Sequence, residues 1–192
     1  MKIEVLTGGA LEAALDDVAR LRIAVFRDWP YLYDGDISYE RQYLDDYLAP
    51  SAIVVAAKDG DEIVGVATGM AMEAHAEDFA APFAERPEPL EQIFYCAESV
   101  LLPAYRGQGI GNAFFDAREA HAKALGRRYS AFCSVIRPQD HPARPKGYSP
   151  LDPFWRKRGY APLPGVQAEF RWTDIGDSDQ SPHKLQFWMK TL

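Results

Sequence analysis

A glycine-rich turn between an apolar segment and an amphipathic segment places the strongest restriction on the fold of this chain. Residues 93–102 are mostly apolar or β-branched and predict a strand. Glycines follow at alternate positions, namely Gly107, Gly109 and Gly111. Residues 110–125 then carry apolar side chains at helical spacing and predict a helix. Because glycine adopts backbone conformations that other residues disfavour, the strand can turn tightly into the first turn of that helix.

The start of such a helix can bind an anion. Its first N–H groups have no partner within the helix, and the helix dipole makes this end positive. Together these features suit a phosphate group, and Arg106 could add a charge-assisted contact. The alternating glycines do not match the dinucleotide-binding spacing, and no P-loop Lys-Ser/Thr pair follows. From the residues alone, a phosphate site and a purely structural turn both remain open.

The rest of the chain mixes predicted strands and helices. Strands are predicted at 3–6, 52–58, 63–72, 93–102, 130–136, 166–173 and 184–190. Helices are predicted at 11–26, 39–47, 110–125 and 154–158. Loops are predicted at 29–36 and 73–92, and the second is long enough to hold a short helix. This order predicts an α/β or α+β protein with a mixed sheet. Because no linker interrupts it, residues 1–192 are expected to form one domain.

The composition excludes several classes of protein. With 47% hydrophobic and 26% charged residues, the chain resembles soluble globular proteins. Its net charge of −7 argues against a nucleic-acid partner. No apolar run approaches the roughly 20 residues that span a membrane. Two isolated cysteines and scattered histidines predict neither disulfides nor a metal site, and we expect a cytoplasmic protein.

The glycine turn resembles a known motif. Residues 106–111 are similar to the acetyl-CoA motif of the GNAT N-acetyltransferase superfamily, which reads Arg or Gln, two residues, Gly, one residue, then Gly or Ala. Residues 154–160 look like the short helix and Gly-aromatic ending that follow the fifth strand of that superfamily. The resemblance implies a mostly antiparallel sheet of about seven strands with flanking helices. It also implies that strands 93–102 and 130–136 splay apart.

The resemblance further implies that acetyl-CoA is the cofactor. In the family, backbone N–H groups of the turn hold the pyrophosphate, and the pantetheine arm pairs like an extra strand with the fourth strand. A backbone N–H near Val100 or Leu101 would polarise the thioester carbonyl. The cofactor-binding residues implied are Val100, Leu101, Leu102, Arg106, Gly107, Gln108, Gly109, Ile110, Gly111 and Asn112.

The family reaction is direct attack of a primary amine on acetyl-CoA in a ternary complex, which needs a general base. Glu98 is the candidate because a carboxylate in an apolar strand is rarely buried without a reason, and partial burial would raise its pKa. A salt-bridged or solvent-facing Glu98 is the alternative. Trp155 stands where many relatives place a tyrosine that can protonate the leaving thiolate. Tyr148 and Tyr160 are nearby substitutes, of which we select Tyr148, and departure of the thiolate without an acid is the alternative.

The loop after the first helix is expected to bind the acceptor. In the family this region often covers the acceptor, and aromatic rings beside carboxylates suit a cationic amine. The residues expected there are Trp29, Tyr31, Tyr33 and Asp34. Aromatic packing beneath a loop is the other interpretation. The basic stretch 137–158 is either a solvated face or a contact for an anion, namely the 3′-phosphate of coenzyme A or an anionic group on the acceptor.

The predicted function is therefore transfer of an acetyl group from acetyl-CoA to an amine. The acceptor would be a small-molecule amine or a protein amino group, and a homodimer is compatible with the sequence. Two alternatives stay open. The first is a non-catalytic acyl-CoA-binding sensor or interaction module, which is considered because Trp155 replaces the family tyrosine. The second is a related transferase that uses a longer acyl donor.

Overall fold

The computed structural model describes residues 1–192 apart from the side chain of Asp46. The strands are β1 (Lys2–Leu6), β2 (Ile53–Asp59), β3 (Glu62–Ala71), β4 (Ile93–Tyr95), β5 (Ser99–Leu101), β6 (Tyr129–Val135), β7 (Ala161–Trp172) and β8 (Ser181–Thr191). The α-helices are α1 (Gly8–Phe26), α2 (Ile37–Leu44), α3 (Ala76–Phe83), α4 (Ile110–Ala124) and α5 (Asp152–Lys157). Short 3-10 turns lie at Asp45–Leu48, Met72–His75, Leu90–Gln92 and Pro103–Tyr105. Among the described residues, no helix is both long and apolar enough to cross a bilayer.

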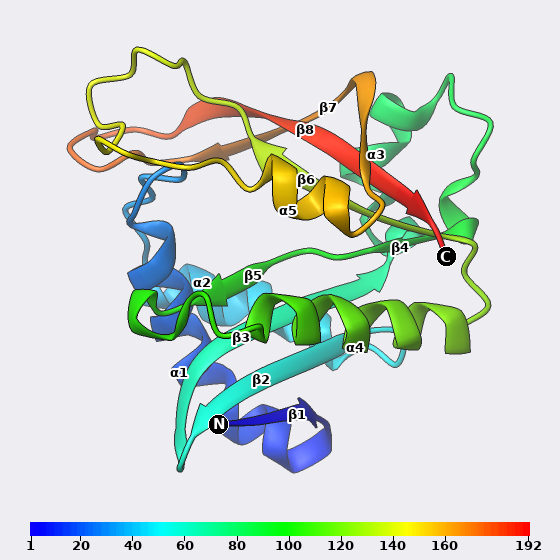
Figure 1. Cartoon of the computed structure of the whole chain (residues 1–192), viewed down its shortest axis with the longest axis horizontal. Coiled ribbons are helices and arrows are strands. Elements are labelled where there is room, and N and C mark those ends of the chain that lie inside the picture. The colour runs from blue at the N-terminus through cyan, green and yellow to red at the C-terminus, as the bar shows by residue number, and fades with distance from the viewer.

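The strands form one mixed sheet in the order β1-β2-β3-β4-β6-β8-β7, with β5 paired to β3. The β4–β6 pair is parallel, whereas the other pairs are antiparallel. Figure 1 shows α1 and α2 on the opposite side of β2 and β3 from α4, and separate apolar clusters fill the two sides. The predicted mixed α/β fold is confirmed.

The predicted strand 93–102 is divided in two by a β-bulge. Met70 of β3 lies opposite Tyr95, whereas Ala67 lies opposite Ser99. The chain between Tyr95 and Ser99 therefore holds one residue more than the matching part of β3, which defines a bulge. Before the bulge β4 pairs with β6, and after it β5 pairs with β3 alone. Figure 1 shows β5 and β6 diverging from this point, so the predicted splay is confirmed and the strand count becomes eight.

The bulge also exchanges the two faces of the strand. Phe94 and Cys96 pack in the apolar cluster that includes α4 residues. Val100 packs instead in the cluster that includes α1 residues. In a regular strand these even-numbered residues would share one face, because successive side chains alternate. The extra residue therefore turns the side chain of Glu98 toward α1 and α2.

Candidate active site

The turn before α4 presents a row of unused backbone donors. Gly107 and Gly109 have positive φ angles of 75° and 85°, and Gly109 precedes the first residue of α4. In the described chain, the N–H groups of residues 107–111 donate to no backbone carbonyl or side chain, whereas the Asn112 N–H donates to Gly109 O at 3.0 Å. No acidic side chain lies in the first helical turn. The positive end of α4 can therefore receive an anion.

The free edge of β5 continues this row of donors. The Leu102 N–H donates to Val64 O at 3.0 Å, and the Thr68 N–H donates to Glu98 O at 3.0 Å. Because backbone groups alternate along a strand, those of even-numbered residues point to β3 and those of Ser99 and Leu101 point to the open edge. The backbone groups of Val100 and Leu102 are used by β3, so the prediction that they contact the pantetheine arm is wrong in this register.

Leu101 keeps its predicted place at the open edge, and its carbonyl accepts a hydrogen bond from Arg106 Nε at 3.3 Å. Ser99 also lies at this edge, although it is not among the predicted cofactor-binding residues. The sequence predicts that backbone groups alternate along the strand. Whether the odd-numbered or the even-numbered residues face the open edge depends on the pairing with β3.

The Glu98 side chain is only 10% exposed, and protein donors surround its carboxylate. Its carboxylate accepts hydrogen bonds from Tyr43 Oη at 2.6 Å, from Tyr47 Oη at 3.1 Å and from Thr68 Oγ1, and it pairs with Arg22. Burial alone would raise its pKa, but the Arg22 charge and the hydrogen bonds from Thr68 and Tyr43 hold the pKa below the ordinary 4.5. The predicted rise in pKa is wrong, because the salt-bridged alternative holds.

Arg22 links Glu98 to a second buried carboxylate. Its guanidinium also pairs with Glu40, whose side chain is fully buried, and it lies over the Tyr43 ring at 4.5 Å. Tyr33, predicted to bind the acceptor, lies against this cluster, where burial and Glu40 raise its pKa. Arg22 is not among the predicted site residues, although it stands four residues from both Val18 and Phe26 on the apolar face of α1.

The environment of Glu98 predicts how stability depends on pH. Because its folded pKa lies below 4.5, its contribution to folding is complete above that value and is lost as the pH falls through the lower folded pKa. When the pH is lowered from about 5 to about 3, the free energy of unfolding should fall less in Glu98→Gln than in the native protein. Urea unfolding at each pH measures this difference. A carboxyl with a raised pKa would instead lose its contribution as the pH rises above 4.5, and that opposite sign would contradict this assignment.

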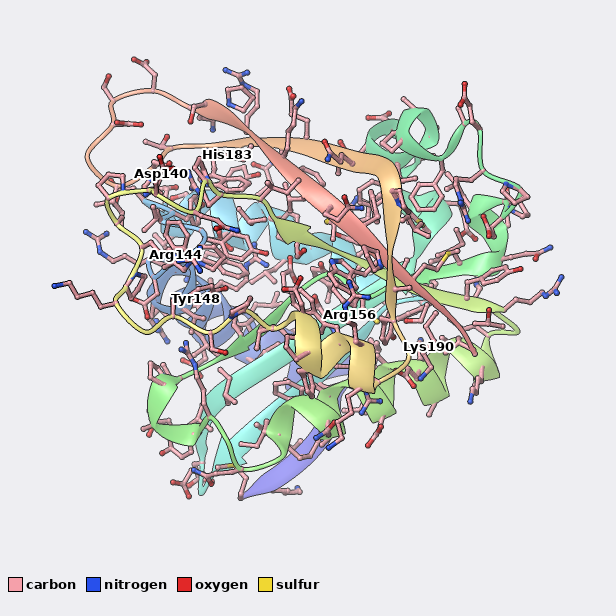
Figure 2. All side chains as sticks on the ribbon, turned by 45° about the horizontal axis from the view of Figure 1, so that its top comes forward. Asp140, Arg144, Tyr148, Arg156, His183 and Lys190 are labelled. Carbon is pink, nitrogen blue, oxygen red and sulfur yellow. The ribbon has the colours of Figure 1, made fainter. Side chains whose placement is uncertain are left out.

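Three residues predicted for different roles meet at one open cavity. Trp29, Arg106 and Tyr148 line a space of about 370 Å³, together with Asp28, Pro145, Lys146 and Gly147. The Trp29 and Tyr148 rings meet edge to face with centroids 6.0 Å apart. Figure 2 shows Arg144 beside Tyr148 on the loop between β6 and α5, and its guanidinium lies 5.3 Å from that ring. Burial raises the pKa of Tyr148, so its hydroxyl stays protonated at neutral pH.

The other predicted acceptor residues lie apart from this cavity. The Tyr31 ring packs on Phe26 at 4.2 Å, and its carbonyl accepts a hydrogen bond from Arg137 Nη2 at 2.6 Å. Asp34 forms an exposed ion pair with Arg27 at 3.0 Å. Aromatic packing under a loop, the alternative interpretation, therefore describes Tyr31.

The residues of the basic stretch lie in different parts of the structure, and so do the two tyrosines considered as proton donors. Arg137 pairs with Asp174 at 2.7 Å, whereas Lys146 lines the cavity. The Tyr160 hydroxyl donates to Ser130 at 2.8 Å inside the core, so it faces no open site. Trp155 packs against Phe132 with centroids 5.0 Å apart.

Comparison with known proteins decides the family. Residues 18–145 match the model of the acetyltransferase (GNAT) family, which is more than half of the chain. The chain belongs to this family. No curated protein matches this GNAT acetyltransferase in sequence.

Solved structures share the GNAT fold over nearly their full length. A ribosomal-protein-alanine N-acetyltransferase from Brucella melitensis has 15% identity and a TM-score of 0.64, with 100% of both chains covered. An aminoglycoside 6′-N-acetyltransferase complexed with coenzyme A has 16% identity and a TM-score of 0.63, covering 100% of this chain and 97% of that one. An N-acetyltransferase from Staphylococcus aureus has 12% identity and a TM-score of 0.61, covering 100% and 99%. At such identities the similarity establishes the fold of this GNAT acetyltransferase and leaves its acceptor open.

Proposed function

We propose that this GNAT acetyltransferase binds acetyl-CoA along the open edge of β5 and the turn at 106–111, and transfers its acetyl group to a primary amine. The observation that carries the proposal is the continuous row of unused donors, from the Ser99 and Leu101 backbone to the N–H groups of residues 107–111. A Cβ placed on Gly107 or Gly109 would meet no protein atom within 4 Å, so the space in front of both is open. These features fit a diphosphate followed by an extended amide-containing arm.

Each part of this row has a separate task. The N–H groups of residues 107–111 would hold the diphosphate, and Arg106 would add a positive charge. Ile110 is 4% exposed and contributes through its backbone, while the Gln108 side chain donates back to Ala104 O at 3.2 Å. The Asn112 side chain accepts a hydrogen bond from Arg158 at 3.0 Å. Bound acetyl-CoA supplies an activated acetyl thioester.

The Ser99 N–H is the donor that we assign to the acetyl carbonyl, and the Leu101 backbone would pair with the pantetheine arm. Glu98 already accepts from four donors, so we assign it the positioning of the bulge instead of proton transfer. Tyr148 remains the proposed proton donor, to the departing thiolate of coenzyme A. The acceptor amine would lose its proton to solvent in the open cavity, where Trp29 offers an aromatic wall to the acceptor. The acceptor is a primary amine on a small molecule or a protein.

Titration calorimetry with acetyl-CoA tests the proposal. We expect the native protein to bind and Arg106→Glu to bind at least about ten-fold more weakly, because the variant places a negative charge beside the diphosphate. Arg128→Glu, an equal charge reversal on an exposed residue beyond the other end of α4, should bind as the native protein does. Thiol release with a panel of primary amines then reports turnover. Absence of binding by the folded native protein would refute the proposal, and binding without turnover on any amine would favour the sensor alternative.

A further inference from the structure

Arg118 of α4 is a buried cation whose hydrogen-bond partners are neutral oxygens. It is only 1% exposed. Its Nη1 donates to Glu98 O at 2.9 Å and to Thr68 O at 3.1 Å, and its Nη2 donates to Ser99 Oγ at 2.9 Å. Its Nε donates to Phe114 O at 3.3 Å within the helix. Arg118 therefore joins the helix that follows the glycine turn to the bulge between β4 and β5.

These contacts converge on a single peptide unit. Glu98 O and the Ser99 N–H belong to the same trans peptide, so they point in opposite directions. Glu98 O receives hydrogen bonds from the Thr68 N–H at 3.0 Å and from Arg118. The Ser99 N–H consequently points to the open edge of β5, where β6 has diverged.

The charge of Arg118 affects the strength of that donor. Hydrogen bonds to an ionised donor are stronger than neutral ones, and bonds in a chain polarise one another. A cation bound to Glu98 O draws electron density through the amide and makes the Ser99 N–H a better donor. Burial of a cation costs free energy that an apolar side chain would avoid, so packing alone does not account for an arginine here.

We propose that Arg118 is a positioning residue of acetyl transfer, which fixes and polarises the 98–99 peptide so that the Ser99 N–H donates strongly to the acetyl carbonyl. This inference rests on the proposed function. Arg118 acts through the peptide and does not touch the substrate. Its location on α4 also ties the helix whose start is proposed to bind the diphosphate to the strand that receives the thioester.

The test observes the carbonyl directly and needs no acceptor. Acetyl-CoA carrying ¹³C at the acetyl carbonyl is bound to the native protein and to Arg118→Met and Arg118→Lys, and the carbonyl is followed by infrared and ¹³C NMR spectroscopy. Arg127→Met is the matched control. Arg127 is also mostly buried, with its side chain 13% exposed, but it lies beyond the far end of α4 and pairs with Glu73 at 2.8 Å.

We expect the native complex to lower the carbonyl stretching frequency relative to free acetyl-CoA. Arg118→Met should lose most of this shift, Arg118→Lys should lose part of it, and Arg127→Met should keep it. Turnover on any amine that the native protein acetylates should fall by about ten-fold or more in Arg118→Met while the KM for acetyl-CoA changes little.

An unshifted carbonyl in the native complex, or a native shift retained by folded Arg118→Met, would overturn the inference and leave acetyl-CoA binding intact. If Arg118→Met does not fold, Arg118→Lys decides, because it keeps the charge but cannot reach all three oxygens at the bulge. A native protein that binds no acetyl-CoA would refute the proposed function itself, and with it the inference.

Discussion

Replacement of Gly109 by valine is expected to weaken acetyl-CoA binding about 100-fold, which corresponds to about 2.8 kcal/mol. Gly109 has a φ of 85° at the start of α4, where a β-branched residue is strained. The valine side chain would also enter the open space in front of the turn, because no atom beyond residue 109 and its two chain neighbours lies within 4 Å of a Cβ at this position. Both effects act on the donors assigned to the diphosphate. Titration calorimetry with acetyl-CoA measures the loss.

Gly126→Val is the matched control for this prediction. Gly126 follows the other end of the same helix with a φ of 73°, and a Cβ there also meets no protein atom within 4 Å. It should therefore lose similar stability while it keeps native affinity for acetyl-CoA. Native affinity in Gly109→Val, or an equal loss in both variants, would show that the turn is not the binding site.

Arg22→Met is expected to reduce the free energy of unfolding by about 3–5 kcal/mol, the largest stability effect that we predict. The substitution leaves Glu40 and Glu98 buried in the core between α1 and β5 without their cation. A buried carboxylate that loses its partner keeps the full cost of its removal from water. Chemical unfolding near neutral pH measures this change.

Two further variants separate this mechanism from a general effect of removing an arginine. Arg41→Met breaks the ion pair with Asp16, in which both side chains are about half exposed, and should change stability by less than about 1 kcal/mol. The triple variant Arg22→Met, Glu40→Gln, Glu98→Gln removes the unpaired charges and should recover part of the lost stability. A triple variant less stable than Arg22→Met alone would contradict the electrostatic explanation.

The amino-acid sequence alone was sufficient to predict the local elements and the turn. Apolar side chains at helical spacing predicted residues 110–125 as a helix, and α4 begins at Ile110 and ends at Ala124. The glycines before it predicted the turn, and Gly107 and Gly109 have the positive φ angles that favour glycine. These features depend on hydrogen bonds and side-chain contacts between residues close in the chain, so periodicity and glycine position reveal them.

Two buried arginines of the site can be located in the sequence, but helical periodicity does not reveal what they bind. Arg118 stands four residues after Phe114 on the apolar face of the predicted helix, just as Arg22 interrupts the apolar face of α1. A basic residue on such a face must donate hydrogen bonds to buried oxygens. The packing of the helix on the sheet determines which oxygens lie within reach.

The role of Glu98 and the choice of donors at the edge of β5 depend on the tertiary structure. The chain between Tyr95 and Ser99 has one residue more than the part of β3 that lies opposite it. This extra residue reverses which side chains face each side of the sheet. That reversal places Glu98 against Arg22 and points the Ser99 N–H to the open edge. The register of a strand is set by its partner, which lies far away in the chain, so a pattern within the strand cannot specify it.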